Sequence, residues 1–213
     1  MNAASRRMLI DGPAGPLEVL RDEPAPGTAA PYRGVAVIAH PHPLYGGTMD
    51  NKVVQTLARA FVMSGWSAVR FNFRGVGASG GTYDEGRGEL DDFLSVVAAH
   101  APDGPLALAG FSFGAFVACA AVPRLHPGRA IAQMVLVGTA SGRFQVPALP
   151  AELHPQTLVI HGESDDTVPL SDVLDWARPQ NLPLTLVPGA SHFFHGQLPL
   201  LRGLVTRHLG ARP

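Results

Sequence analysis

The stretch LALAGFSFGAFVACA, residues 106–120, decides how this chain folds. Its first part, Leu106–Ala109, is a continuous apolar run that predicts a buried strand, and the small apolar residues from Ala115 onward predict a helix. Between them, Gly110-Phe111-Ser112-Phe113-Gly114 matches the pattern G-x-S-x-G, in which a sharp strand-to-helix turn lifts a serine hydroxyl above a sheet. The alternative, an ordinary glycine-rich turn, does not require this strand–helix setting. We therefore predict that Ser112 is a nucleophile presented on such a turn.

Strand-like and helix-like segments alternate along the rest of the chain. The expected strands are Met8–Ile10, Leu17–Leu20, Gly34–Ala39, Trp66–Phe73, Leu106–Phe111, Ile131–Gly138, Thr157–His161 and Leu184–Val187. The expected helices are Asn51–Ser64, Glu89–His100, Ala115–Leu125, Ser171–Trp176 and Leu198–His208. This alternation predicts an α/β fold with a mostly parallel sheet of about eight strands, begun by two antiparallel strands and covered by helices on both faces. We expect one domain over residues 1–213 with no cap domain, because the segment between Gly138 and Thr157 is short.

A serine nucleophile needs a base, and the base needs an acid that orients it. On folds with this turn the chain order is serine, then an acid, then histidine. The segment from His161 to Pro169 follows one expected strand and offers Asp165 and Asp166 as the acid, and both stay open at this point. The segment after the last strand offers His192 and His195 as the base. We predict His192, which lies nearer the strand end and is followed by a phenylalanine, and expect His195 to be structural or on the rim.

The loop His40-Pro41-His42-Pro43-Leu44-Tyr45 follows the strand Gly34–Ala39, where this kind of fold supplies an amide to an oxyanion hole. Proline has no N–H, so the donors left in this loop are His42, Leu44 and Tyr45. We predict an oxyanion hole made of the Phe113 amide and the His42 amide, with Leu44 and Tyr45 as open alternatives. His40 and His42 also form an H-x-H pair that could bind a metal, but the barrel that commonly carries such a pair needs ~250 residues. We therefore predict no metal.

Residues Gly75–Gly80 match the dinucleotide-binding pattern G-x-G-x-x-G. That function requires a helix opening inside the motif and an acid at the end of the following strand. Here the loop continues to Tyr83, and the acids that follow begin a helix instead. We interpret this region, with Asn72, Arg74 and Ser79, as scaffold or pocket wall. The acidic run from Asp84 to Asp92 is interpreted as a solvated helix start rather than a metal site.

Composition excludes several classes of function. The net charge of −1 provides no basic excess to attract a phosphate backbone, so we expect no nucleic acid partner. The single cysteine, Cys119, permits no intrachain disulfide and is expected to be a buried packing residue. The N-terminal residues have no apolar region of the secretory kind, and no apolar run approaches the ~18 residues of a membrane span. The sequence therefore predicts a cytoplasmic protein without a membrane partner.

Four motifs together resemble one family: HPHPLYGGTMDNKVV (residues 40–54), FNFRGVGASGG (71–81), GFSFG (110–114) and SHFFH (191–195). The chain resembles small bacterial α/β-hydrolases without a lid, related to dienelactone hydrolases. The resemblance implies the α/β-hydrolase fold and a Ser–Asp–His triad, carried here by Ser112, Asp165 and His192, with no cofactor. Dienelactone hydrolase has a cysteine where this chain has Ser112, so the resemblance does not imply that substrate.

We accordingly predict a serine hydrolase of the carboxylesterase kind that cleaves small carboxylic esters through an acyl-enzyme on Ser112. Thioesters or small peptides are alternative substrates for the same triad, and a non-catalytic ligand-binding protein is an alternative of another class. The expected partner is a small-molecule ester, and a homodimer is left open. Tyr45, Leu44, Phe111 and Phe193 are expected to crowd the substrate pocket and to limit it to a short acyl group.

Overall fold

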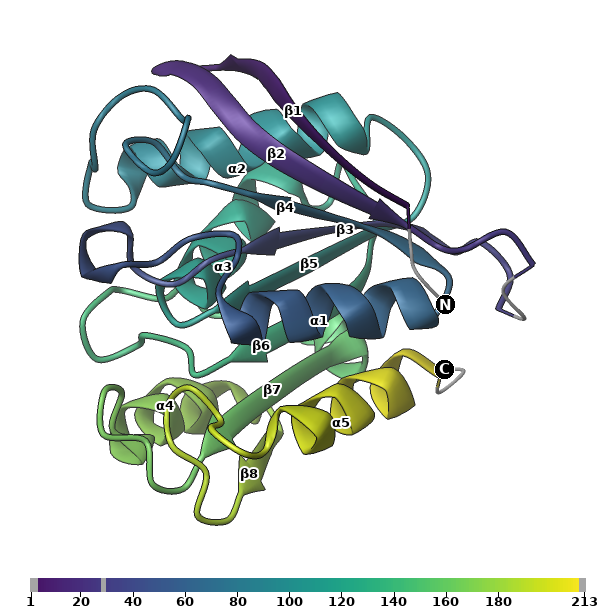
Figure 1. Ribbon diagram of the computed structural model, residues 1–213. Helices are drawn as coiled ribbons and strands as arrows, with labels where there is room; N and C mark the ends of the chain where they lie inside the picture. The colour runs from purple at the N-terminus through teal and green to yellow at the C-terminus, as the bar shows by residue number, and fades with distance from the viewer. Residues whose placement is uncertain (1–3, 28–29, 211–213) are drawn as a thin grey trace.

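A computed structural model describes residues 4–27 and 30–210 and contains an eight-stranded sheet (Figure 1). The strands lie in the order β1-β2-β4-β3-β5-β6-β7-β8. Their bounds are β1 Ala4–Gly12, β2 Gly15–Glu23, β3 Gly34–Ala39, β4 Trp66–Phe71, β5 Leu106–Phe111, β6 Ile131–Val137, β7 Thr157–Gly162 and β8 Leu184–Val187. The pairs from β4 to β8 are all parallel, whereas β1–β2 and β2–β4 are antiparallel. The predicted mostly parallel sheet with two antiparallel strands at its beginning is confirmed.

The first hairpin is longer than the sequence predicted. The short apolar runs Met8–Ile10 and Leu17–Leu20 lie inside two nine-residue strands that pair from Ala4 with Glu23 to Gly12 with Gly15. The polar residues at the open end of the hairpin carry no apolar periodicity, so pattern alone could not extend the strands that far. Their pairing arises from backbone hydrogen bonds along the ladder and from side-chain contacts across it, such as the hydrogen bond that Ser5 Oγ donates to Asp22 Oδ1.

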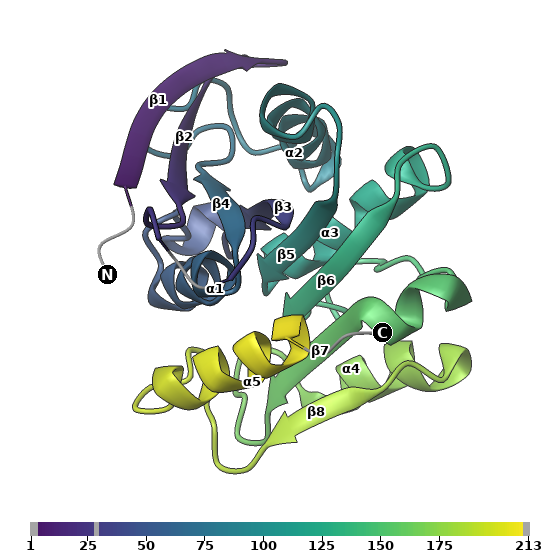
Figure 2. The same cartoon turned by 90° about the vertical axis from the view of Figure 1, so that its right-hand side faces the viewer.

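Helices cover both faces of the sheet, as expected for strands that are apolar on both sides (Figure 2). Two helices, α1 (Lys52–Met63) and α5 (Leu198–Gly210), pack on one face, and three others, α2 (Arg87–His100), α3 (Phe113–Leu125) and α4 (Leu170–Ala177), pack on the opposite face. Helix α1 begins where predicted, because the Asn51 side chain accepts a hydrogen bond from Val53 N–H at 2.9 Å and caps it. Its buried face carries Val54, Leu57 and Phe61.

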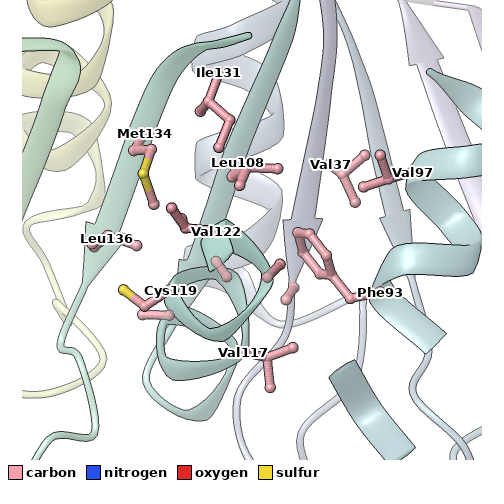
Figure 3. Close-up of a cluster of buried hydrophobic side chains, with 14 of the residues drawn as sticks. Val37, Phe93, Val97, Leu108, Val117, Cys119, Val122, Ile131, Met134 and Leu136 are labelled. Carbon is pink, nitrogen blue, oxygen red and sulfur yellow. The ribbon is translucent and has the colours of Figure 1, made fainter. Parts of the chain in front are cut away.

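The core is divided by the sheet into two apolar clusters, one under each helix layer. Figure 3 shows part of the larger cluster, where Phe93 of α2 and Val117 and Val122 of α3 meet the side chains of the central strands. Cys119 is fully buried in this cluster, as predicted, and burial raises the pKa of its thiol. Each of β3, β4 and β5 has six residues, and all of them are buried, so the strands that lead to His42 and Ser112 lie entirely within the core.

The parallel strands end together at one edge of the sheet, and every loop predicted to carry a site residue leaves from that edge (Figure 1). Ligands of open α/β sheets bind at this edge. The segment from β6 to β7 contains only turns and the short 3-10 helix Ala151–Gln156, so no domain is inserted there. Within residues 4–27 and 30–210, no helix has both the length and the hydropathy needed to cross a membrane.

Candidate active site

Ser112 lies on the sharp turn between β5 and α3. Its backbone has φ 56° and ψ −116°, a conformation that residues other than glycine adopt only under constraint from their surroundings. The constraint comes from close backbone packing. A Cβ atom on Gly110 would collide with the carbonyl of Gly114, and one on Gly114 would collide with the carbonyl of Ala39. The glycines of the motif therefore permit a turn that no other residues could close.

Two backbone amides belong to residues that line the same cavity as the predicted nucleophile. Phe113 is the first residue of α3, so its N–H has no acceptor within the helix and lies at the positive end of the helix dipole. In the loop after β3, Leu44 N–H donates to His42 Nδ1 at 3.2 Å and Tyr45 N–H donates to the His42 carbonyl at 3.1 Å. In the part of the chain that the structure describes, His42 N–H has no acceptor. Of the three amides left open by the sequence, the His42 amide is therefore the one available to a ligand.

Asp165 and His192 form a direct hydrogen bond, from His192 Nδ1 to Asp165 Oδ2 at 2.7 Å. Their loops follow β7 and β8 and are joined by backbone bonds, with Glu163 N–H donating to Val187 and Ser164 N–H donating to Ala190. Asp166, the alternative acid, is exposed, and among the described residues its single hydrogen-bond donor is the neighbouring Thr167. The structure thus brings together the acid and the base that the sequence favoured.

The Asp165 side chain is fully buried, yet it is held in its charged form. Burial alone would raise the pKa of this carboxyl, but the hydrogen bond from His192, the N–H groups of Val168 and Thr167 and the charge of His192 outweigh burial and lower the pKa. The two amides donate to Oδ1 at 2.8 Å and 3.0 Å, which leaves Oδ2 for the imidazole. The carboxylate is therefore both ionised and fixed in orientation.

The His192 imidazole is buried between aromatic rings. The Phe111 ring lies against it with centroids 4.7 Å apart, and the Phe193 ring meets it at 5.1 Å and 82°. Gly138 lies on another side, where an added Cβ would come 3.1 Å from His192 Cε1. Ser112 and His192 line the same cavity but do not hydrogen-bond to each other in the described part of the chain. Contacts of this kind often tighten only when substrate binds.

The cavity has a volume of about 90 Å³, well below the ~300–1,000 Å³ of pockets that hold drug-sized ligands. It is lined by residues from the loops at the strand ends: Pro41, His42, Tyr45, Gly46, Gly47, Asn51, Ser112, Phe113, Ala140, Arg143, Phe144, Thr167, Val168, His192 and Phe193. Of the four predicted wall residues, Tyr45 and Phe193 are present. Leu44 points into solvent at 65% exposure, and Phe111 is buried beneath His192, so the predicted place of both in the pocket wall is wrong.

The cavity is also lined by four residues that were not predicted as site residues: Arg143, Phe144, Asn51 and Thr167. Arg143 and Phe144 follow β6, so their position just beyond a strand end was the available signal. No motif distinguishes them, because β6 is followed by an irregular segment whose course depends on tertiary packing. Phe144 stacks on Phe116 of α3 at 4.7 Å and 12°.

His40 supports the loop rather than the cavity. Its Nδ1 shares a hydrogen bond of 2.6 Å with the Pro41 carbonyl, and its Nε2 accepts one from Phe73 N–H at 3.0 Å. Burial lowers the pKa of His40 to about 4. The hydrogen bond to the Pro41 carbonyl favours the charged form and raises the pKa, but its effect is smaller than that of burial. Since both ring nitrogens are occupied by backbone groups, His40 is not free to join His42 as a metal ligand.

The loop after β4 is a hydrogen-bonded scaffold, as interpreted from the sequence. Glu18 Oε2 accepts hydrogen bonds from Asn72 at 2.7 Å and from Ala78 N–H at 3.0 Å. The acidic helix start, however, is only partly solvated: Glu85 and Asp91 are exposed, but two other acids are not. Glu89 and Asp92 are fully buried, and Asp92 forms a two-pronged ion pair with Arg74 at 2.7 Å and 3.0 Å. The expectation of a solvated helix start was wrong for these two carboxylates, because Asp92 holds the loop to α2 and Glu89 accepts hydrogen bonds from the N–H groups of Asp84 and Gly86 at 2.9 Å and 2.8 Å.

A strained serine at a strand-to-helix turn, two residues with free amides in the same cavity and a buried histidine–aspartate pair on neighbouring loops define an α/β-hydrolase of the serine type. Residues 31–154 match the family described as "Serine aminopeptidase, S33". The chain belongs to the α/β serine hydrolases without a lid, which confirms the predicted family and fold.

Individual relatives agree with this assignment. The chain is 33% identical over 204 residues to an uncharacterised protein of Rickettsia prowazekii, covering 88% of this chain and 82% of that protein. It is 39% identical, with a TM-score of 0.86, to the crystal structure of a lidless α/β serine hydrolase from Xanthomonas campestris, covering 100% of this chain and 99% of that one. An α/β serine hydrolase homologue from Coxiella burnetii is 38% identical with a TM-score of 0.81, covering 96% of this chain and 97% of that one.

Proposed function

We propose that the protein hydrolyses small carboxylic esters through an acyl-enzyme on Ser112. The observation that carries this proposal is the His192–Asp165 pair, bonded at 2.7 Å, on the wall of the cavity that also holds Ser112 at its strained turn. Because His192 Nδ1 is held by Asp165, the imidazole keeps one tautomer, in which Nε2 is free to accept a proton.

In the first half of the reaction, Ser112 Oγ attacks the ester carbonyl carbon while its proton passes to His192 Nε2. The carbonyl oxygen becomes an oxyanion, which accepts hydrogen bonds from the N–H groups of Phe113 and His42. Asp165 stabilises the imidazolium that forms. The C–O bond to the alcohol then breaks, and the alcohol leaves with the proton from His192.

In the second half, a water molecule attacks the acyl carbonyl and gives one proton to His192. The bond to Ser112 Oγ breaks, the serine regains its proton from His192, and the carboxylic acid leaves. No inserted domain covers the cavity, so water can reach the acyl-enzyme. The cavity volume of about 90 Å³ favours a short acyl group.

The family match makes peptide hydrolysis a second candidate, because it is described for a serine aminopeptidase. An aminopeptidase must hold the ammonium group of its substrate, and a carboxylate is the usual partner for that charge. None of the described residues that line the cavity is an aspartate or a glutamate, and the lining includes Arg143 instead. This charge distribution favours an uncharged or anionic ester over a peptide with a free amino terminus.

The test is labelling with a fluorophosphonate, followed by intact mass and by turnover of p-nitrophenyl esters and aminoacyl p-nitroanilides. We expect one adduct on the wild type, none on Ser112→Ala, and turnover of the acetyl and butyryl esters. Asp165→Asn should lower kcat by about 10⁴-fold, whereas Asp166→Asn serves as the matched control with near wild-type turnover. Labelling that survives Ser112→Ala would refute the nucleophile, and anilide turnover above ester turnover would favour the peptidase.

A further inference from the structure

Arg143 is a cation in the wall of the candidate active site that the mechanism does not use. It lies on the turn that follows β6, and this turn is fixed to the nucleophile. Ala140 N–H donates to the Ser112 carbonyl at 3.4 Å, and Phe144 N–H donates to the Ala140 carbonyl at 3.2 Å. The Phe144 ring, packed on α3, anchors the other end of the turn. The backbone at Arg143 is therefore held at a set position relative to Ser112.

This guanidinium has no counter-ion in the described part of the chain. Across residues 4–27 and 30–210, no carboxylate lies within ion-pair distance of it. Asp165 is nearest the reaction centre but is committed to His192 and two backbone amides. Asp172 packs against Gly142, the neighbour of Arg143, without reaching the guanidinium itself. The turn thus brings a positive charge to the cavity and leaves it unpaired.

Arg143 is exposed at the wall of the cavity, so its charge can meet a ligand that enters from solvent. His42 and Arg143 line the same cavity. Burial first and the positive charge of Arg143 second lower the pKa of His42. His42 stays neutral there and adds no second charge. Arg143 is therefore the single charged side chain among the described lining residues other than the titratable histidines.

Much of the rest of the lining is apolar, with Phe113, Phe144, Val168 and Phe193 near the reaction centre. A short hydrocarbon segment with a charged end would match both parts of the wall. A planar guanidinium binds a carboxylate with two parallel hydrogen bonds, a geometry that an uncharged ester cannot supply.

We propose that Arg143 forms an anion-binding subsite and that the substrate is a small ester bearing an additional, ionised carboxylate. The inference rests on the proposed esterase function and deepens it. Arg143 acts as a specificity-determining residue, which binds the substrate away from the bond that is cleaved. The carboxylate can belong to the acyl portion or to the alcohol portion of the ester, and the experiment below distinguishes the two.

The experiment compares charged and uncharged esters of equal size. Mono-p-nitrophenyl glutarate is set against p-nitrophenyl pentanoate for the acyl side, and 4-carboxyphenyl pentanoate against phenyl pentanoate for the alcohol side. The variants are Arg143→Gln, Arg143→Lys and, as the matched control, Arg207→Gln. Arg207 is exposed in the last turn of α5. Figure 1 shows that α5 ends at the side of the sheet away from the loops that carry the candidate site.

The measured quantity is kcat/KM for the charged ester divided by kcat/KM for its uncharged counterpart. We expect Arg143→Gln to lower this ratio by about tenfold for either the acyl pair or the alcohol pair of esters, mainly because the KM of the charged ester rises. Arg143→Lys should retain part of the ratio, because the charge remains without the planar fork. Arg207→Gln should retain all of it, and raising the salt concentration to 0.5 M should reduce the preference of the wild type. An equal ratio in the wild type, Arg143→Gln and Arg207→Gln on both sides would overturn the inference.

A binding measurement separates failure of the subsite from failure of the esterase function. If neither ester is hydrolysed and the fluorophosphonate does not label Ser112, the proposed function fails. Calorimetric titration of glutarate into Ser112→Ala, with and without Arg143→Gln, then still decides the subsite. An affinity about tenfold weaker in the double variant supports it, and equal affinities refute it.

Discussion

Acidification should weaken the fold through His40, the buried histidine that ties the loop after β3 to the end of β4. Protonation would place a charge where burial opposes it and would remove the acceptor for Phe73 N–H. In the unfolded chain the same imidazole titrates near 6.5. The folded state therefore binds fewer protons than the unfolded state between these two values. Stability from His40 is complete above pH 6.5 and is lost as the pH falls toward about 4.

The size of the effect follows from the gap between the two pKa values. Each tenfold difference in proton affinity is worth about 1.36 kcal/mol, so a folded pKa of about 4 corresponds to a maximal loss of about 3 kcal/mol. Between pH 7 and pH 4.5 most of this gap is crossed, and the expected loss is about 2 kcal/mol. That is a large share of the ~5–15 kcal/mol that stabilises a typical domain.

Urea unfolding at pH 7 and pH 4.5 measures this loss in the wild type and in His40→Gln, whose side-chain oxygen can still accept from Phe73 N–H. Other histidines with lowered pKa values are present in both proteins, so the comparison isolates His40. We expect the wild type to lose about 2 kcal/mol more than the variant on acidification. If the difference in the free energy of unfolding between the two proteins is the same at both pH values, the reasoning is refuted.

Three further predictions concern packing and access. Gly114→Ala should lower the free energy of unfolding by about 2–4 kcal/mol, because its Cβ would collide with the Ala39 carbonyl. Gly203→Ala, at an exposed position of α5 where an added Cβ meets nothing within 4 Å, should raise the free energy of unfolding by about 0.5–1 kcal/mol, and urea titration measures both changes. Cys119 is fully buried and has a raised thiol pKa, so iodoacetamide at pH 8 should not alkylate it in the native protein and should add one adduct in urea. Intact mass measures the adduct, and alkylation of the native protein would contradict the burial of Cys119. Phe193→Ala, which removes a ring that is 42% exposed at the cavity, should raise the kcat/KM of octanoyl over acetyl esters severalfold, and an unchanged ratio would show that this ring does not limit chain length.

Much of the fold could be predicted from the sequence because its signals are local. Continuous apolar runs marked β3, β5 and β8 at their observed bounds, and Asn51 marked the start of α1. The pairing of Asp165 with His192 could also be anticipated, because both follow strands that end at the same edge of the sheet. Chain order and spacing carry information about side chains that meet only after folding.

The remaining features depend on contacts that no local pattern encodes. Phe111 precedes the nucleophile directly, yet strand alternation turns its ring beneath His192 and away from the cavity. Asp92 looks like a solvated acid at a helix start until its ion pair with Arg74 is known. Arg143 lies in an irregular segment, and only the packing of Phe144 on α3 explains why it faces the candidate site.

The three residues proposed for the triad follow three different strands, β5, β7 and β8, and the last of them comes near the end of the chain. During synthesis, a chain complete through β6 already contains its nucleophile but has neither acid nor base. On the proposed mechanism, Ser112 of such a chain cannot be acylated at an appreciable rate, so an incomplete chain does not hydrolyse esters. Recovery of ester turnover after dilution from denaturant therefore measures when β7 and β8 pair with the sheet. Spectroscopic signals from the helices do not resolve this step, because they sum over every helix of the protein.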